Sequence, residues 1–252
     1  MSQNPLNMQS SNPTLKDAFK LTAVEGDAMT VRGTLTKFAI GFALLFASAA
    51  FTWKAGQDGV NIIAWLMPAL IVGLGLAFLT VFKKTWSPFL MPVYALAQGV
   101  VVGGISVYTN DMFQKTAPNI VMEAVGLTFG VVLVMLALYS FRIIRASQTL
   151  IKVIVFATAG IAIYYLISLL AGAFGYEVPL IHENTWQGIL FSLVVVVVAA
   201  LNLILDFHYI EEGSRNGAPK YMEWYGAFGL LVTIIWLYLE LLRLLSKVYG
   251  RK

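Results

Sequence analysis

Seven long apolar runs constrain this chain more than any other feature of its sequence. They cover residues 38–53, 60–82, 86–108, 119–141, 153–174, 187–206 and 222–246. A helix needs about 20 apolar residues to cross the hydrocarbon core of a bilayer. Because lipid offers the backbone no hydrogen-bond partners, each run is predicted to be a helix. We therefore predict an all-α, polytopic membrane protein, in which seven transmembrane helices form one domain over 35–248 after a polar N-terminal tail, 1–34.

Two other kinds of fold fit the composition poorly. Of the 252 residues, 59% are hydrophobic and 12% are charged, and the mean hydropathy is +0.77. A soluble domain of this size leaves too much surface in water for such a composition. The valine-rich stretch 194–198 is compatible with a strand, but the runs are too long for barrel strands and lack their alternation. The chain has no cysteine, which excludes disulfides and thiolate metal sites.

Small residues inside two of the runs have the spacing of helix-packing sites. Gly99 and Gly103 are four residues apart in the third run, and Gly73 and Gly75 lie in the second. Small residues let two backbones approach closely in lipid, where hydrophobicity cannot drive helices together. Glycine is also common in membrane helices that do not use it for packing, so chance spacing is the alternative interpretation.

The distribution of lysine and arginine predicts the orientation in the membrane. With a cytoplasmic N-terminus, the 17 basic residues divide into 11 on inner segments, 2 in outer loops and 4 after the seventh run. A re-entrant last segment would bring those 4 inside as well, but 224–239 is continuous and apolar, so a plain crossing is the simpler interpretation. The first 34 residues contain no apolar stretch of signal-peptide length, so no cleaved segment is expected.

Ionisable side chains inside the runs are the candidates for function, because a charge in hydrocarbon is costly without a partner or a water-filled cavity. Asp206 ends the sixth run, and Asn202 lies one helical turn before it on the same face. Asp206 is either a solvated acid at a helix end or a buried carboxylate that binds a cation or a proton. In the seventh run, Glu240 and Arg243 are three residues apart and can pair, and Glu223 lies near its start.

Residues suited to catalysis are sparse. His182 and His208 are the two histidines of the chain, too few for a three-histidine zinc site, although mixed His/Asp ligation stays open. Neither a P-loop nor a G-x-S-x-G motif occurs. The basic residues form no contiguous face of the kind that nucleic acids need. We therefore expect no enzymatic activity, no cofactor and no nucleic-acid partner, and we interpret Glu123 as an interfacial acid.

Three segments carry a resemblance to a known family. They are LDFHYIEEGSRNGAPKYMEWYGAFGLLVTIIWLYLELLRLL near the C-terminus, NPTLKDAF and MTVRGTLTK before the first run, and PVYALAQGVVVGGIS in the third. In these places, and in hydropathy over nearly the whole chain, the sequence resembles the bacterial branch of the Bax inhibitor-1 family.

The resemblance implies a fold in which the last of seven helices is wrapped by the other six, and a pH-sensitive leak of calcium ions. It also implies two aspartates, on the sixth and seventh helices, that share a hydrogen bond and sense protons. Two close carboxylates cannot both ionise cheaply, so such a pair responds to pH. Asp206 matches the sixth-helix aspartate. On the seventh helix the family's LYLD reads LYLE here, which indicates Glu240, whereas alignment on the downstream LLR indicates Thr233.

Depth along the helix favours another partner for Asp206. Glu240 lies about 25 Å beyond Glu223 along the seventh helix, toward the membrane face opposite Asp206. Our hypothesis is therefore an acid pair of Asp206 with Glu223, which is also the candidate calcium site. The acids of the candidate ion pathway and pH sensor are Asp206, Glu223 and Glu240. Asn202 and Arg243 are the candidate supporting residues, and Glu211 or Glu212 is expected at the mouth of the pathway.

The leading functional hypothesis is a proton-gated leak of cations, calcium in particular, across the bacterial cytoplasmic membrane. Carboxylate oxygens are hard ligands that suit Ca²⁺, and protonating them weakens cation binding. The alternative is a non-transporting membrane protein that binds or regulates a membrane partner such as a protease. A membrane hydrolase that uses His208, Asp206 and a metal is the least favoured of the three.

Overall fold

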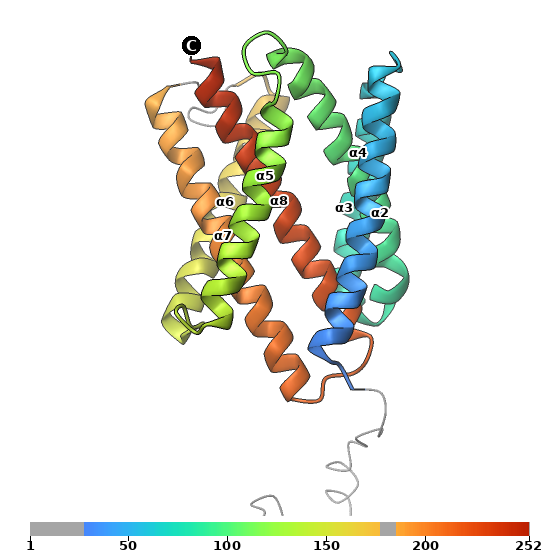
Figure 1. Cartoon of the computed structure of the whole chain (residues 1–252), viewed down its shortest axis with the longest axis vertical. Coiled ribbons are helices and arrows are strands. Elements are labelled where there is room, and N and C mark those ends of the chain that lie inside the picture. Colours follow the sequence, from blue (N-terminus) through green and yellow to red (C-terminus); the bar gives the residue numbers. More distant parts are fainter. Residues whose placement is uncertain (1–27, 177–184, 252) are drawn as a thin grey trace, which may run out of the picture.

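The computed structural model describes residues 28–176 and 185–251. Within these ranges the chain forms seven long helices and no strand (Figure 1). The helices are α2 (Val31–Gln57), α3 (Ile63–Phe82), α4 (Ser87–Phe113), α5 (Ile120–Ser140), α6 (Gln148–Ala173), α7 (Trp186–Arg215) and α8 (Met222–Gly250), with a short 3₁₀ turn, η1 (Lys84–Trp86), before α4. All seven are long and apolar enough to cross a membrane, so the predicted seven-helix, all-α architecture is confirmed.

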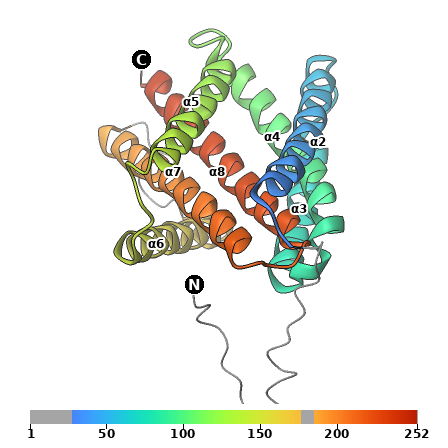
Figure 2. The same cartoon turned by 60° about the horizontal axis from the view of Figure 1, so that its bottom comes forward.

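The last helix occupies the centre of the bundle. α2, α4, α5 and α7 pack directly against α8, whereas α3 packs on α4 and α6 on α7 (Figures 1 and 2). The expectation that six helices wrap α8 is thus refined to an inner layer of four and an outer layer of two. We call the end of the bundle at which α2 and α8 begin the basal end, and the opposite end the apical end.

The helices extend beyond the apolar runs where polar residues cap them. Thr30 precedes α2 and accepts a hydrogen bond from the Gly33 N–H, so this helix begins at Val31, inside the segment assigned to the tail. Residues 1–27 of that tail lie outside the described residues. α7 continues nine residues past Asp206 to Arg215, and Gly217, at φ +65°, then turns the chain toward α8.

Glycines of α4 allow this helix to lie close against α2. A Cβ added at Gly103 would meet the backbone oxygen of Ala49 at 2.6 Å, and one at Gly99 would meet the backbone oxygen of Leu45 at 2.5 Å. The packing predicted for this pair of glycines is therefore present. Gly73 of α3 faces the Gln98 side chain, but Gly75 has nothing within 4 Å, so its predicted packing role is wrong.

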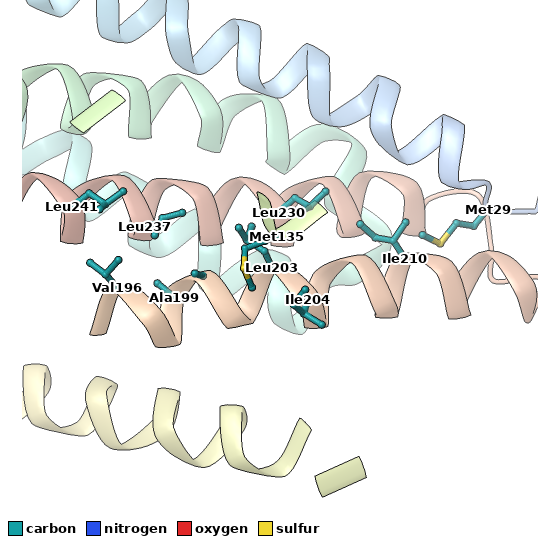
Figure 3. Packing of buried hydrophobic residues seen from close by; sticks show 11 residues of the cluster. Met29, Met135, Val196, Ala199, Leu203, Ile204, Ile210, Leu230, Leu237 and Leu241 are labelled. Carbon is teal, nitrogen blue, oxygen red and sulfur yellow. The ribbon is translucent and has the colours of Figure 1, made fainter. Parts of the chain in front are cut away.

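The contact between α7 and α8 forms the largest apolar cluster. Figure 3 shows side chains of the two helices in contact along their length, with Met135 of α5 between Leu230 and Leu203 and Met29 at the basal end of the cluster. Leu203 and Leu237 are fully buried in it. Because apolar burial gives no net gain in lipid, this close packing stabilises the pair through dispersion contacts. It also fixes the depth of every polar side chain that α7 presents to α8.

We predict that Gly103→Ala destabilises the protein, because its new methyl group would meet a backbone atom that cannot rotate away. The expected loss is about 1–3 kcal/mol, typical of overpacking, seen as a lower midpoint of thermal unfolding in detergent. The matched control is Gly130→Ala in α5, where nothing lies within 4 Å of the added atom. It should leave stability unchanged or raise it by up to about 1 kcal/mol. Equal midpoints for both variants would contradict the close α2–α4 contact.

Candidate functional site

Asp206 is a carboxylate of α7 that faces the central helix. Its Oδ1 would lie 3.7 Å from a Cβ placed on Gly229, and the Thr233 side chain, one turn further along α8, also faces it. The other oxygen, Oδ2, is buried and has no hydrogen-bond partner among the described residues. Because α7 continues nine residues to Arg215, Asp206 lies about 13 Å inside the bundle from its basal end. The buried-carboxylate interpretation therefore describes it better than the solvated helix end.

Asn202, one turn earlier, serves a different contact. Its side-chain amide donates to the Thr158 hydroxyl of α6 and to the Val198 carbonyl oxygen, both at 2.8 Å. The residue thus ties α6 to α7 through a polar contact in an otherwise apolar interface. Both of these bonds of the Asn202 amide therefore serve this contact rather than the Asp206 carboxyl group.

Glu223 does not pair with Asp206, and that part of our hypothesis is wrong. Asp206 meets α8 at Gly229 and Thr233, and Glu223 lies six residues before the first of these, about 9 Å along the helix axis. The Glu223 carboxylate is instead held by basic and hydroxyl groups of other segments, so the predicted calcium ligand pair is not formed.

Four groups surround the fully buried Glu223 side chain. The backbone N–H and hydroxyl of Thr30 donate to Oε1 at 3.0 and 2.9 Å. The Lys220 ammonium group lies 2.9 Å from Oε1 and that of Lys37 3.1 Å from Oε2. Gly33 leaves room for this carboxylate, because any side chain there would collide with it. The result is an ion cluster that joins the start of α2 to the start of α8.

The Glu223 cluster was only partly visible in the sequence. Lys220 lies three residues before Glu223, and a pair at this spacing is a common local signal. Thr30 lies just before α2, 193 residues from Glu223 in sequence, and Lys37 lies within α2. Only the packing of α2 against α8 brings them near. A backbone bond from the Met29 N–H to the Ala218 carbonyl oxygen, 2.7 Å, closes the same junction.

Glu240 lies in the apical half of α8 in a second buried cluster. Arg243 donates to both of its carboxylate oxygens at 2.9 and 3.0 Å, as the three-residue spacing indicates. The Tyr165 hydroxyl of α6 donates to the same oxygens at 2.9 and 3.0 Å, and the Trp236 indole N–H donates at 3.2 Å. This geometry favours the ion-pair interpretation of Glu240, while its role in an ion pathway stays a prediction.

Further acids lie near the two ends of the bundle. Glu211 at the basal end accepts from the Tyr139 hydroxyl and pairs with Arg215, and Glu212 lies 3.4 Å from His208. At the apical end, Glu123 accepts from the Tyr249 hydroxyl at 2.8 Å. Among the described residues no three His, Asp or Glu side chains gather as metal ligands, and His182 lies outside those residues.

Comparison with protein families places the chain in a known group. The family model described as "Bax inhibitor 1 like" matches residues 4–250, nearly the whole chain. The chain belongs to the Bax inhibitor 1 like family. A search of curated proteins finds no individual relative that matches it.

Within this Bax inhibitor 1 like protein, the geometry distinguishes the two alignments of the last helix. Thr233 faces Asp206, whereas Glu240 lies seven residues further toward the apical end, about 10 Å along the axis. Thr233 therefore occupies the position opposite the sixth-helix aspartate. A hydroxyl group stands where the resemblance implies a second carboxyl group, so Asp206 is the one acid at this contact within 28–176 and 185–251.

We predict that Glu223→Gln separates the starts of α2 and α8, because the amide keeps the size but loses the charge that two lysines approach. The expected cost is about 2–3 kcal/mol, the scale of one hydrogen bond to a charged group, or a fall of about 5–10 °C in the unfolding midpoint. Glu212→Gln serves as control, since that carboxylate is 54% exposed and meets one histidine. A midpoint equal to that of the control would refute the cluster's structural role.

Proposed function

We propose that this protein is a proton-gated leak for cations, calcium in particular, with Asp206 as the proton-sensitive group. The observation that supports this most is the unpartnered oxygen of a carboxylate buried against the central helix. An ionised carboxylate in such a place is costly unless it holds a cation. It can lower that cost by binding a proton or a cation, and the two compete for the same oxygens.

The contact partners of Asp206 support a coupling between its charge and helix packing. Gly229 presents no side chain to the carboxyl group, so α7 and α8 approach closely at this level. When Asp206 is protonated, the neutral group fits the apolar contact between the two helices. When it is ionised, solvation of the charge favours separation of the helices and entry of water or a cation. In this proposal the α7–α8 contact is the gate.

The distribution of charged side chains supports an orientation of the cation pathway relative to the membrane. Glu211 and Glu212 lie on the same helix as Asp206, between it and the basal end, and acids at a mouth attract cations. The basic residues Lys83, Lys84 and Arg142 also lie in segments at this end. We accordingly propose a bacterial cytoplasmic membrane location with the basal end in the cytoplasm.

Calcium flux into liposomes, followed with an enclosed dye from mildly acidic to mildly alkaline pH, tests the proposal. Flux through the wild type should rise with pH, because deprotonation restores the negative charge that attracts the cation. Asp206→Asn mimics the protonated group, so its flux should stay at the acidic level of the wild type throughout. Asp111→Asn, the same change at an exposed apical position, should follow the wild type.

The remaining outcomes are informative as well. Flux that rises with pH in Asp206→Asn would leave a leak but remove Asp206 as its sensor. No flux at any pH would favour the alternative, a membrane protein that binds or regulates a partner. Thr233→Asp adds a second carboxyl group at the Asp206 contact, and since like charges so close oppose ionisation, the pH profile should move to higher pH.

The proposed orientation has its own test. A reporter that is active only in the cytoplasm, fused after residue 252, should be inactive, because seven crossings place the two chain ends on opposite sides. The same reporter fused within the basal turn between α5 and α6 should be active. An active C-terminal fusion would contradict a full crossing by α8 and favour the re-entrant interpretation of the last segment.

A further inference from the structure

An apolar cavity of about 460 Å³ lies between α2 and α5, away from the Asp206 contact. In Figure 1 these two helices stand on either side of α8, which forms the floor of the cavity with Leu231, Ile235 and Tyr238. α4 closes the back. Where α2 and α5 meet, Phe42 and Phe129 touch edge to face with ring centroids 5.8 Å apart. The size falls in the range of about 300–1,000 Å³ that is usual for small-molecule sites.

The cavity opens sideways, toward the surroundings of the bundle. Its rim includes Phe46 of α2 and Met122 of α5, whose exposed fractions are 60% and 71%. Both residues lie within membrane-crossing helices, so the medium outside this opening is lipid hydrocarbon. Lipid acyl chains are therefore the solvent at the mouth of the cavity, and no other molecule is as concentrated there.

The three hydroxyl groups that line the cavity are already hydrogen-bonded within the protein, which disfavours water as its occupant. The Ser106 hydroxyl bonds the Val102 carbonyl oxygen and the Tyr238 hydroxyl, both at 2.6 Å. The Thr128 hydroxyl donates to the Ala124 carbonyl oxygen at 2.7 Å. A buried water needs two to four polar partners, and the hydrogens of these hydroxyl groups are already donated within the protein. An apolar occupant loses nothing by contact with such a lining.

The dimensions fit one acyl chain better than a whole lipid. From Phe38 to Trp53 the α2 wall extends about 22 Å along the helix. One leaflet contributes about half of the ~30 Å hydrocarbon core, so a single chain spans most of this length. Trp53 and Asn110 mark the apical end of the lining, at the level where indole rings and amides meet lipid headgroups.

We propose that this cavity binds one acyl chain of a phospholipid from the apical leaflet, with its headgroup outside near Trp53 and Asn110. The chain fills the space between α2 and α5 and contacts α8 directly at Ile234 and Ile235. It thereby supplies the dispersion contacts that these helices lack with one another. The inference is independent of the proposed cation leak, since it uses a different face of α8.

Photo-cross-linking in liposomes tests this binding. The probe is phosphatidylcholine with a diazirine near the end of one acyl chain, and adducts are mapped by peptide mass spectrometry. Ile235 and Tyr238 line the cavity and are only 7% and 6% exposed, so lipid that merely surrounds the bundle has almost no access to them. We expect adducts on the α8 segment 231–238, in addition to the surface labelling of α3 and α6 that any bilayer gives.

A substitution at the mouth separates intercalation from surface contact. Ala50→Trp places an indole in the opening, so adducts on 231–238 should fall at least several-fold while labelling of α3 and α6 persists. Ala47→Trp is the matched control, because Ala47 is exposed on the same helix but does not line the cavity. Val125→Trp places an indole in the opening from α5, and this second variant is used if Ala50→Trp does not fold. Wild-type adducts confined to α3 and α6, or undiminished α8 adducts in both blocked variants, would overturn the proposal.

Discussion

The absence of hydrogen-bond partners in hydrocarbon is the constraint on which the rest of this structure depends. It forces the backbone into long helices, and it forces every ionisable side chain within them to find a partner inside the protein. Because apolar burial does not drive helices together in lipid, their arrangement depends on close approach and on polar contacts. The α2–α4 contact at Gly99 and Gly103 is the first kind, and the Glu223 cluster is the second.

Three buried acids meet this constraint in different ways. Glu223 is neutralised by two lysines and the start of α2, and Glu240 by Arg243 with help from Tyr165. Both clusters join segments distant in sequence and stabilise one arrangement of the bundle. Asp206 alone faces a glycine and a threonine, without a cation among its described neighbours. A charge that the protein leaves uncompensated is one that the surroundings can change, which is why the proposed switch is placed there.

The sequence was sufficient for the helices and for the pairing of near neighbours. The apolar runs predicted all seven, and the spacing of Glu240 and Arg243 indicated their contact. Helix ends were harder, because a polar cap such as Thr30 extends a helix beyond its apolar run. The partners of Glu223 at the start of α2 could not be predicted, because no local sequence pattern fixes the axial offset between two helices that are distant in sequence. The same unknown offset made the Asp206–Glu223 pair wrong.

The position of α8 connects the two proposals without making one depend on the other. One face of this helix meets Asp206 through Gly229 and Thr233, and another meets the cavity through Leu231 and Ile235. The ion clusters at Glu223 and Glu240 hold α8 on either side of these two contacts. In the two proposals, a proton on one face and an acyl chain on the other would therefore act on the same segment. If the proton and the acyl chain favour different positions of this segment of α8, then acyl-chain binding should change the proton affinity of Asp206. By the same coupling, protonation of Asp206 should change the affinity of the cavity for the acyl chain.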